Sequence, residues 1–194
     1  MRIGLSVDEI QWLAGEIQSA RHEIRKIAVQ MHSDMANDEE LQNDYWLAQS
    51  RFSHFRKFYE FENPSFLEAL RCGENDAIED AIVFLSADPY CFRSGYIKKK
   101  LCHLLTQCVL TPRQRLLLRE IVINSVTAHR PVSFREFVEL GCALYTSGFY
   151  ARVRNLKIIP FSYAIKRKRI LLAAMERAGA AWKKKQEMLA AETP

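Results

Sequence analysis

The 194-residue sequence predicts an all-α fold: a long N-terminal helical hairpin, then short packed helices in a helical-repeat or bundle-like arrangement, and a basic C-terminal helix. Seven glycines and six prolines are few for a turn-rich β-sandwich or barrel. Apolar residues recur mainly at steps of three and four, which is the spacing of one helix face. Because the sequence contains no Asn-Gly or Asp-Gly turn and no clear alternating run, no strand is expected.

Two long helices are expected at the N-terminus. Ser6 and Glu9 have the spacing of a capping box, in which each side chain accepts a backbone N–H of the other residue. Apolar residues then recur over 10–31 and again over 41–59. The short polar link between these runs favours an antiparallel hairpin. The alternative is an intermolecular coiled coil, which would make a homo-oligomer through the heptad-like helices.

Caps and helix breakers mark the boundaries of the next elements. Asn63-Pro64 combines an N-cap residue with proline at the first helical position, so a helix is expected to begin there. Gly73 is expected to end that helix, because glycine adopts the left-handed conformation of a C-terminal cap. Asp88-Pro89 is expected to stop the helix that follows.

The C-terminal part is expected to continue in the same way. Thr111 and Gln114 form a second capping box around Pro112. Gly148 is expected to end a later helix, and the pattern over 149–161 fits either a short helix or an extended connector. A last helix is expected from residue 162 to about residue 191.

The charges are unevenly distributed along the chain. Residues 1–90 carry 8 Lys and Arg against 17 Asp and Glu, a net charge of −9. Residues 91–194 carry 20 against 6, a net charge of +14. Either the two halves attract each other or each half faces a different partner. We expect an acidic, aromatic-rich hairpin over 1–62 and a basic helical region over 63–194, packed together as a single domain.

Compartment signals favour the cytoplasm. The N-terminus reaches Asp8 and Glu9 before any apolar run, unlike a signal peptide. The longest apolar stretches fall far short of the roughly 18 residues that span a bilayer, so integral membrane association is not expected. Five cysteines, an odd number in a chain of this size, are typical of reduced cytosolic thiols.

No motif for catalysis, metal binding or cofactor binding is present in the sequence. The phosphate-binding, dinucleotide-binding and nucleophile-elbow patterns are absent, and no pair of cysteines has zinc-ligand spacing. The five histidines are dispersed. We therefore expect no catalytic residue, no metal and no cofactor, and an enzyme with a dispersed active site is the least favoured class.

The C-terminal helix is the first candidate binding surface. On a helical wheel Lys166, Arg177 and Lys184 lie nearly opposite the apolar residues Leu171 and Met175, so one face would dock on the body while the other presents cations to phosphates. A solvated outer face, an anionic membrane and an acidic protein are the alternatives. The candidate nucleic-acid- or anion-binding residues are Lys98, Lys99, Lys100, Arg113, Lys166, Arg167, Lys168, Arg169, Arg177 and Lys184.

The second candidate surface is aromatic. Eight of the 21 aromatic residues lie over 45–66. On the second helix one apolar stripe comprises Tyr45, Phe52, Phe55 and Tyr59, and a second comprises Leu47, Phe58 and Phe61. A helix that is apolar on two faces must be covered twice, either by a protein partner or by the later helices of the same chain. The candidate partner-binding residues are Tyr45, Phe52, Phe55, Phe58, Tyr59 and Phe61.

One stretch carries a resemblance. Residues 88–96 read Asp-Pro-Tyr-Cys-Phe-Arg-Ser-Gly-Tyr, lysines and leucines follow, and residues 110–114 read Leu-Thr-Pro-Arg-Gln. The region 87–126, about a fifth of the chain, resembles uncharacterised bacterial α-helical proteins of HEAT-like type. The resemblance implies a bacterial helical-repeat protein and supplies neither an activity nor catalytic residues.

These observations favour a non-enzymatic helical protein–protein interaction module of the bacterial cytoplasm, either an adaptor or an immunity-type inhibitor. Its acidic, aromatic-rich hairpin would engage a protein partner. The rival prediction is a nucleic-acid-binding protein without sequence preference, which would use the basic C-terminal half.

Overall fold

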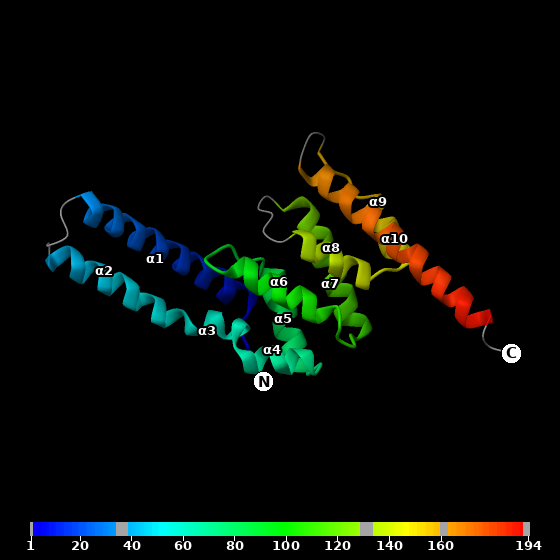
Figure 1. Ribbon diagram of the computed structural model, residues 1–194, viewed down its shortest axis with the longest axis horizontal. Helices are drawn as coiled ribbons and strands as arrows, with labels where there is room; N and C mark the ends of the chain where they lie inside the picture. Colours follow the sequence, from blue (N-terminus) through cyan, green and yellow to red (C-terminus); the bar gives the residue numbers. More distant parts are fainter. Residues whose placement is uncertain (1, 34–38, 129–133, 160–162, 192–194) are drawn as a thin grey trace. The chain divides into compact units, whose positions relative to one another are not determined.

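The computed structural model describes residues 2–33, 39–128, 134–159 and 163–191. Side chains are described for these residues except at 32–33, 52–53 and 182–191. The described residues form ten α-helices and two 3-10 turns and contain no strand, so the predicted all-α class is confirmed (Figure 1).

The chain packs as two compact units. Unit 1 comprises residues 1–98 and unit 2 comprises residues 99–194. The division predicted after residue 62 rested on composition, whereas the division after Lys98 follows the packing and falls inside a helix, α6 (Ser94–Leu105).

Unit 1 begins with the predicted helical hairpin. Helix α1 spans Val7–Ser33 and helix α2 spans Glu39–Arg51, and the two lie side by side (Figure 1). The capping box of α1 is present: the Ser6 N–H donates to Glu9 Oε2 at 2.7 Å, and the Glu9 N–H donates to Ser6 Oγ at 3.2 Å. An ion pair between Arg51 and Glu23 joins the two helices, with 2.7 Å between Nη1 and Oε2.

The second helix does not continue to Tyr59 as predicted. The chain tightens after α2 into the 3-10 turn η1 (Phe52–Phe55), the single turn α3 (Arg56–Tyr59) and the 3-10 turn η2 (Glu60–Glu62). Residues three apart lie on the same side of a 3-10 helix. The tighter winding therefore helps to turn Phe55, Phe58 and Phe61 toward the core, and they are 8%, 0% and 1% exposed.

Helix α4 (Pro64–Arg71) has both predicted ends. The Asn63 side chain accepts the Ser65 N–H at 3.0 Å at its start. At its end Gly73 adopts φ +77, and the N–H groups of Gly73 and Glu74 return to earlier carbonyls of the helix. This arrangement is a Schellman cap, and the positive φ explains why glycine occupies the position.

Aromatic rings form the centre of unit 1. Helix α5 (Asn75–Ala87) brings Phe84 to 4.5 Å from Phe61 and 5.5 Å from Phe58, measured between ring centroids. Phe66 of α4 contacts Phe61 at 5.4 Å. All four rings are at most 1% exposed, so this cluster is the core of unit 1.

Unit 2 contains the end of α6 and four further helices. These are α7 (Pro112–Thr127), α8 (Phe134–Ala143), α9 (Ser147–Arg154) and α10 (Tyr163–Ala191). The capping box predicted for α7 is present, because Gln114 N–H donates to Thr111 Oγ1 and Thr111 N–H donates to Gln114 Oε1.

The prediction for Gly148 is wrong. Helix α8 ends at Ala143, and Gly148 lies in the first turn of α9. Thr146 starts α9, since its Oγ1 accepts the Phe149 N–H at 3.1 Å. Of the ambiguous segment 149–161, the part up to Arg154 is thus helical, and residues 160–161 lie outside the described residues.

Helix α10 packs against α7, α8 and α9. Leu171 and Met175 of α10 are completely buried, as are Val122 of α7 and Leu140 of α8. A Cβ on Gly141 would lie 2.9 Å from Leu171 Cδ1 and 3.3 Å from Val122 Cγ1. The missing side chain of Gly141 therefore lets α8 approach α7 and α10 closely.

Candidate interaction surfaces

The outer face of α10 presents part of the predicted cationic surface. Lys166, Arg169 and Arg177 are exposed, opposite the buried Leu171 and Met175. The exposure predicted by the helical wheel is confirmed for Lys166 and Arg177, and their role in binding stays a prediction. The side chain of Lys184 lies outside the described residues.

Arg167 does not belong to this surface, contrary to the prediction. Its side chain is buried, and its Nη1 donates to the carbonyl oxygens of Ser125, Val126 and Ala128 at 3.2, 3.4 and 2.6 Å. A cation at this position stabilises the free carbonyls at the C-terminal end of α7. Lys168 also binds a backbone carbonyl, since its Nζ donates to the Leu156 carbonyl oxygen at 2.8 Å.

The three consecutive lysines of α6 differ in exposure: Lys98 is buried, whereas Lys99 and Lys100 are exposed. Lys98 belongs to unit 1, is 2% exposed and forms an ion pair with Asp88. It is therefore not available as a surface cation. Lys99 is exposed and its Nζ lies 3.9 Å from Glu136 Oε1, and Lys100 is exposed as well. Arg113, on α7, is also exposed.

Cations outnumber acids in unit 2, and the acids are engaged. Each of the four described carboxylates of unit 2 has a partner: Glu120 with Arg152, Glu136 with Lys99, Glu139 with Arg135 and Glu176 with the Tyr150 hydroxyl. Hydrogen bonding to Arg152 lowers the pKa of Glu120 below its ordinary value. The exposed cations that form no ion pair with a described residue are Lys100, Arg115, Arg154, Lys157, Lys166, Arg169 and Arg177.

The aromatic prediction is wrong for three of its six residues. Phe55, Phe58 and Phe61 are core residues and face no partner. The Phe52 side chain lies outside the described residues, while Tyr45 and Tyr59 are half-buried.

Tyr59 carries a buried hydroxyl that has no hydrogen-bond partner among the described residues. Burial, with further contributions from Cys91 and Glu62, raises its pKa to about 12. Burial likewise raises the pKa of the neighbouring Cys91 thiol to about 12, so this thiol is protonated at neutral pH.

Exposed aromatic surface lies instead on α2. The Trp46 side chain is 66% exposed, and its ring meets Tyr45 edge to face at 6.3 Å. Gln49 Nε2 donates to the Tyr45 hydroxyl at 2.9 Å. The exposure of Trp46 could have been predicted from a helical wheel. Trp46 lies two residues, about 200°, from Ala48, the buried residue of α2. We call Tyr45, Trp46 and Gln49 the α2 aromatic surface.

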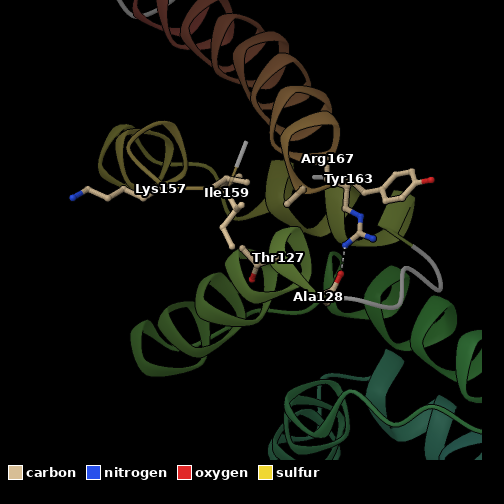
Figure 2. A pocket seen from close by; sticks show the side chains of 8 residues that line it. Thr127, Ala128, Lys157, Ile159, Tyr163 and Arg167 are labelled. Carbon is tan, nitrogen blue, oxygen red and sulfur yellow. Dashed lines mark hydrogen bonds between the residues drawn. The ribbon is translucent and has the colours of Figure 1, made fainter. Parts of the chain in front are cut away.

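A cavity of about 390 Å³ lies in unit 2 (Figure 2). The end of α7, the segment after α9 and the first turns of α10 line it. In Figure 2 Lys157 and Tyr163 extend away from each other, while the Arg167 guanidinium points to the Ala128 carbonyl. Ile159 and Tyr163 line the cavity and are 81% and 84% exposed.

A metal site, a disulfide and a membrane-spanning helix each have requirements that the described residues do not meet. No group of three His, Cys, Asp or Glu side chains among the described residues is arranged to hold a metal ion. The five cysteines are free thiols. In the described ranges, no helix combines the length and the apolar character needed to cross a bilayer.

The comparisons with known proteins leave the resemblance of residues 87–126 a prediction. The chain matches no protein-family model, no curated protein and no solved structure.

Proposed function

We propose that the chain is a non-enzymatic helical protein–protein interaction module that binds a protein partner through the α2 aromatic surface. The observation that carries this proposal is the 66% exposure of Trp46, held in edge contact with Tyr45. Tryptophan and tyrosine are enriched among the residues that dominate binding energy at protein interfaces. A positioned ring also loses little conformational entropy on binding.

The charges of α2 indicate the chemistry of the partner. Glu39, Glu40 and Asp44 are exposed on the same short helix as Trp46. Opposite charges on the facing surface favour a partner that carries Lys or Arg around an aromatic-accepting pocket. An adaptor and an immunity-type inhibitor would both use such a surface, and the identity of the captured protein distinguishes them.

Trp46→Ala and Trp12→Ala form a matched pair for the test. Trp12 lies on α1 and is 63% exposed, so both substitutions remove a similarly exposed indole. A photo-crosslinking amino acid at position 47, where Leu47 is 60% exposed, captures the neighbour in native cells. We expect one defined adduct, lost with Trp46→Ala and retained with Trp12→Ala.

The captured protein, once purified, should bind the wild-type chain and lose at least about tenfold in affinity with Trp46→Ala. A crosslink to a second copy of the chain would support the predicted homo-oligomer instead of a different partner. Equal loss with both tryptophan variants, or no adduct at all, would contradict the α2 aromatic surface as the binding site.

A second candidate function, nucleic-acid binding without sequence preference, has its own supporting observation. The described carboxylates of unit 2 are all engaged, while seven exposed cations form no ion pair with a described residue. Such an excess attracts phosphates and releases counterions on binding.

The test compares two triple variants that remove the same charge. Lys166, Arg169 and Arg177 are changed to Ala in one, and the exposed unit 1 residues Arg25, Arg56 and Lys57 are changed to Ala in the other. In oligonucleotide titrations at several salt concentrations, each lost phosphate contact should lower the salt slope by about one. A slope that both triple variants change equally would remove the α10 face from this candidate function.

A further inference from the structure

Three exposed apolar side chains of unit 2 come from two segments, Ile159 from the chain after α9 and Tyr163 and Ile170 from the first turns of α10. Ile159 and Tyr163 line the same cavity (Figure 2). Ile170 is 45% exposed and lies seven residues after Tyr163, so the two share one face of α10, about two turns apart. Exposed apolar residues elsewhere in unit 2, such as Val109 and Leu116, lie away from this cavity, and isolated exposed apolar residues are ordinary.

Cations flank these apolar side chains, with Lys157 extending away from Tyr163 (Figure 2). Lys157 lines the same cavity as Ile159, and Lys166 lies between Tyr163 and Ile170 on the outer face of α10. Arg169 adds a further exposed charge on the same turn as Ile170. None of the three cations forms an ion pair with a described residue. We call Lys157, Ile159, Tyr163, Lys166, Arg169 and Ile170 the basic–apolar edge.

We propose that the basic–apolar edge docks on an anionic lipid surface. Moving aliphatic side chains from water to the acyl boundary of a membrane is favourable. Tyrosine is enriched at the headgroup level. The three cations are complementary to anionic lipid headgroups. This surface lies in unit 2, so the proposal does not rest on the α2 aromatic surface of unit 1.

The isoleucines favour lipid over nucleic acid as the occupant. Single-stranded nucleic acid is bound by cations along its backbone and by aromatic rings that stack on its bases. Two exposed isoleucines contribute to neither interaction. A lipid surface uses the aliphatic groups and the cations together.

Vesicle co-sedimentation of the full chain tests the proposal, with phosphatidylcholine vesicles that contain or lack phosphatidylserine. Ile159→Ser with Ile170→Ser removes the aliphatic groups, and Val109→Ser with Leu116→Ser is the matched control, because those residues are 91% and 53% exposed. Lys166→Gln with Arg169→Gln removes cations, and Arg56→Gln with Lys57→Gln in unit 1 is its control.

We expect the wild-type chain to sediment with vesicles that contain phosphatidylserine and not with vesicles that lack it. The bound fraction should fall as the salt concentration is raised. The isoleucine pair should lower partitioning about tenfold, which is less than full burial of one side chain would give. The lysine–arginine pair should lower it about thirtyfold, since two cations are removed and each is worth about 1 kcal/mol near such a surface. Both controls should bind like the wild type, and circular dichroism should show unchanged helix content.

The proposal is overturned if the chain fails to bind phosphatidylserine vesicles, or if it binds both vesicle types equally. It is also overturned if the isoleucine pair and its control lose the same amount. Vesicle binding that depends on the cations but not on the isoleucines also overturns the proposal, because phosphate contacts alone would explain it. Oligonucleotide binding that the isoleucine pair retains would then assign the edge to nucleic acid.

Discussion

At the residue scale, two of the buried charged side chains, Arg167 and Asp80, satisfy backbone groups that would otherwise lack partners. Arg167 accomplishes this for the end of α7 by donating to three carbonyls, and its guanidinium lies 5.7 Å from the centre of the Phe134 ring. Asp80, 4% exposed on α5, accepts the backbone N–H groups of Ile3 and Gly4 and so anchors the N-terminal segment. In each case the charge is used locally and is not presented to a partner.

Replacing Arg167 with alanine should destabilise the protein by about 2–3 kcal/mol, because three buried or partly buried carbonyls lose a charged donor. Lys166→Ala, one residue away on the exposed face, should change stability by less than about 0.5 kcal/mol. Urea denaturation followed by circular dichroism measures both. Similar effects of the two substitutions would contradict the assignment of Arg167 as a structural residue.

Replacing Tyr59 should raise the stability of the protein, whereas replacing Arg167 should lower it. Its hydroxyl is buried without a hydrogen-bond partner in the described structure, so Tyr59→Phe removes a desolvation cost. We expect the variant to be more stable than the wild type by about 1 kcal/mol at pH 7. A loss of stability in urea denaturation would show that the hydroxyl has a partner in solution.

The same residue gives a pH dependence with a definite sign. The Tyr59 pKa is about 12 in the folded protein, against an ordinary value of 10.0. Ionisation of Tyr59 therefore leaves stability unchanged below about pH 10 and lowers it as the pH rises toward 12. The unfolding free energy of the wild type should fall in this window, and Tyr59→Phe should make the fall shallower. Cys91, whose pKa is raised from 9.0 to about 12, adds a second decrease that the variant keeps.

At the element scale, helix boundaries with local causes could be predicted from the sequence. The capping boxes at Ser6 and Thr111 and the glycine cap at Gly73 involve side chains within a few residues of one another. The break after Arg51 could not be predicted in this way. Contacts of Phe58 and Phe61 with Phe84, more than twenty residues away, accompany that break, and a wheel drawn for one helix does not contain them.

The candidate binding residues were predicted only in part for the same reason. Composition shows that a residue is charged or aromatic, while the fold decides whether it reaches solvent. Lys166 and Arg167 are neighbours of the same charge, yet they lie about 100° apart on α10, so one is exposed and the other is buried. Trp46 is exposed although it lies within the aromatic-rich segment.

Two glycines within helices should respond to alanine with opposite signs. A Cβ at Gly15 meets nothing within 4 Å, so Gly15→Ala should stabilise α1 by about 0.5–1 kcal/mol. At Gly141 the added Cβ presses on Leu171 and Val122, and the strain should outweigh the same gain, giving a loss of about 1 kcal/mol. Chemical denaturation of both variants measures this difference. Equal stabilisation would mean that the contact of α8 with α7 and α10 adjusts freely.

At the scale of the whole molecule, each unit has its own buried core and its own net charge. Residues 1–98 carry 10 Lys and Arg against 17 Asp and Glu, whereas residues 99–194 carry 18 against 6. The rings around Phe84 fill unit 1, and the aliphatic residues around Val122 fill unit 2. Helix α6 is the element whose residues are shared between them.

Separate cores should give separate local stabilities, which hydrogen exchange with mass spectrometry resolves by segment. Phe84→Leu removes ring contacts from unit 1, so exchange in α4 and α5 should speed up about tenfold while α7 and α8 keep their protection. Val122→Ala should have the reciprocal effect, since Val122 is completely buried in unit 2. Residues of α6 should respond to both substitutions. If either substitution speeds exchange equally in both units, the chain unfolds as one cooperative body, and the two cores stabilise each other.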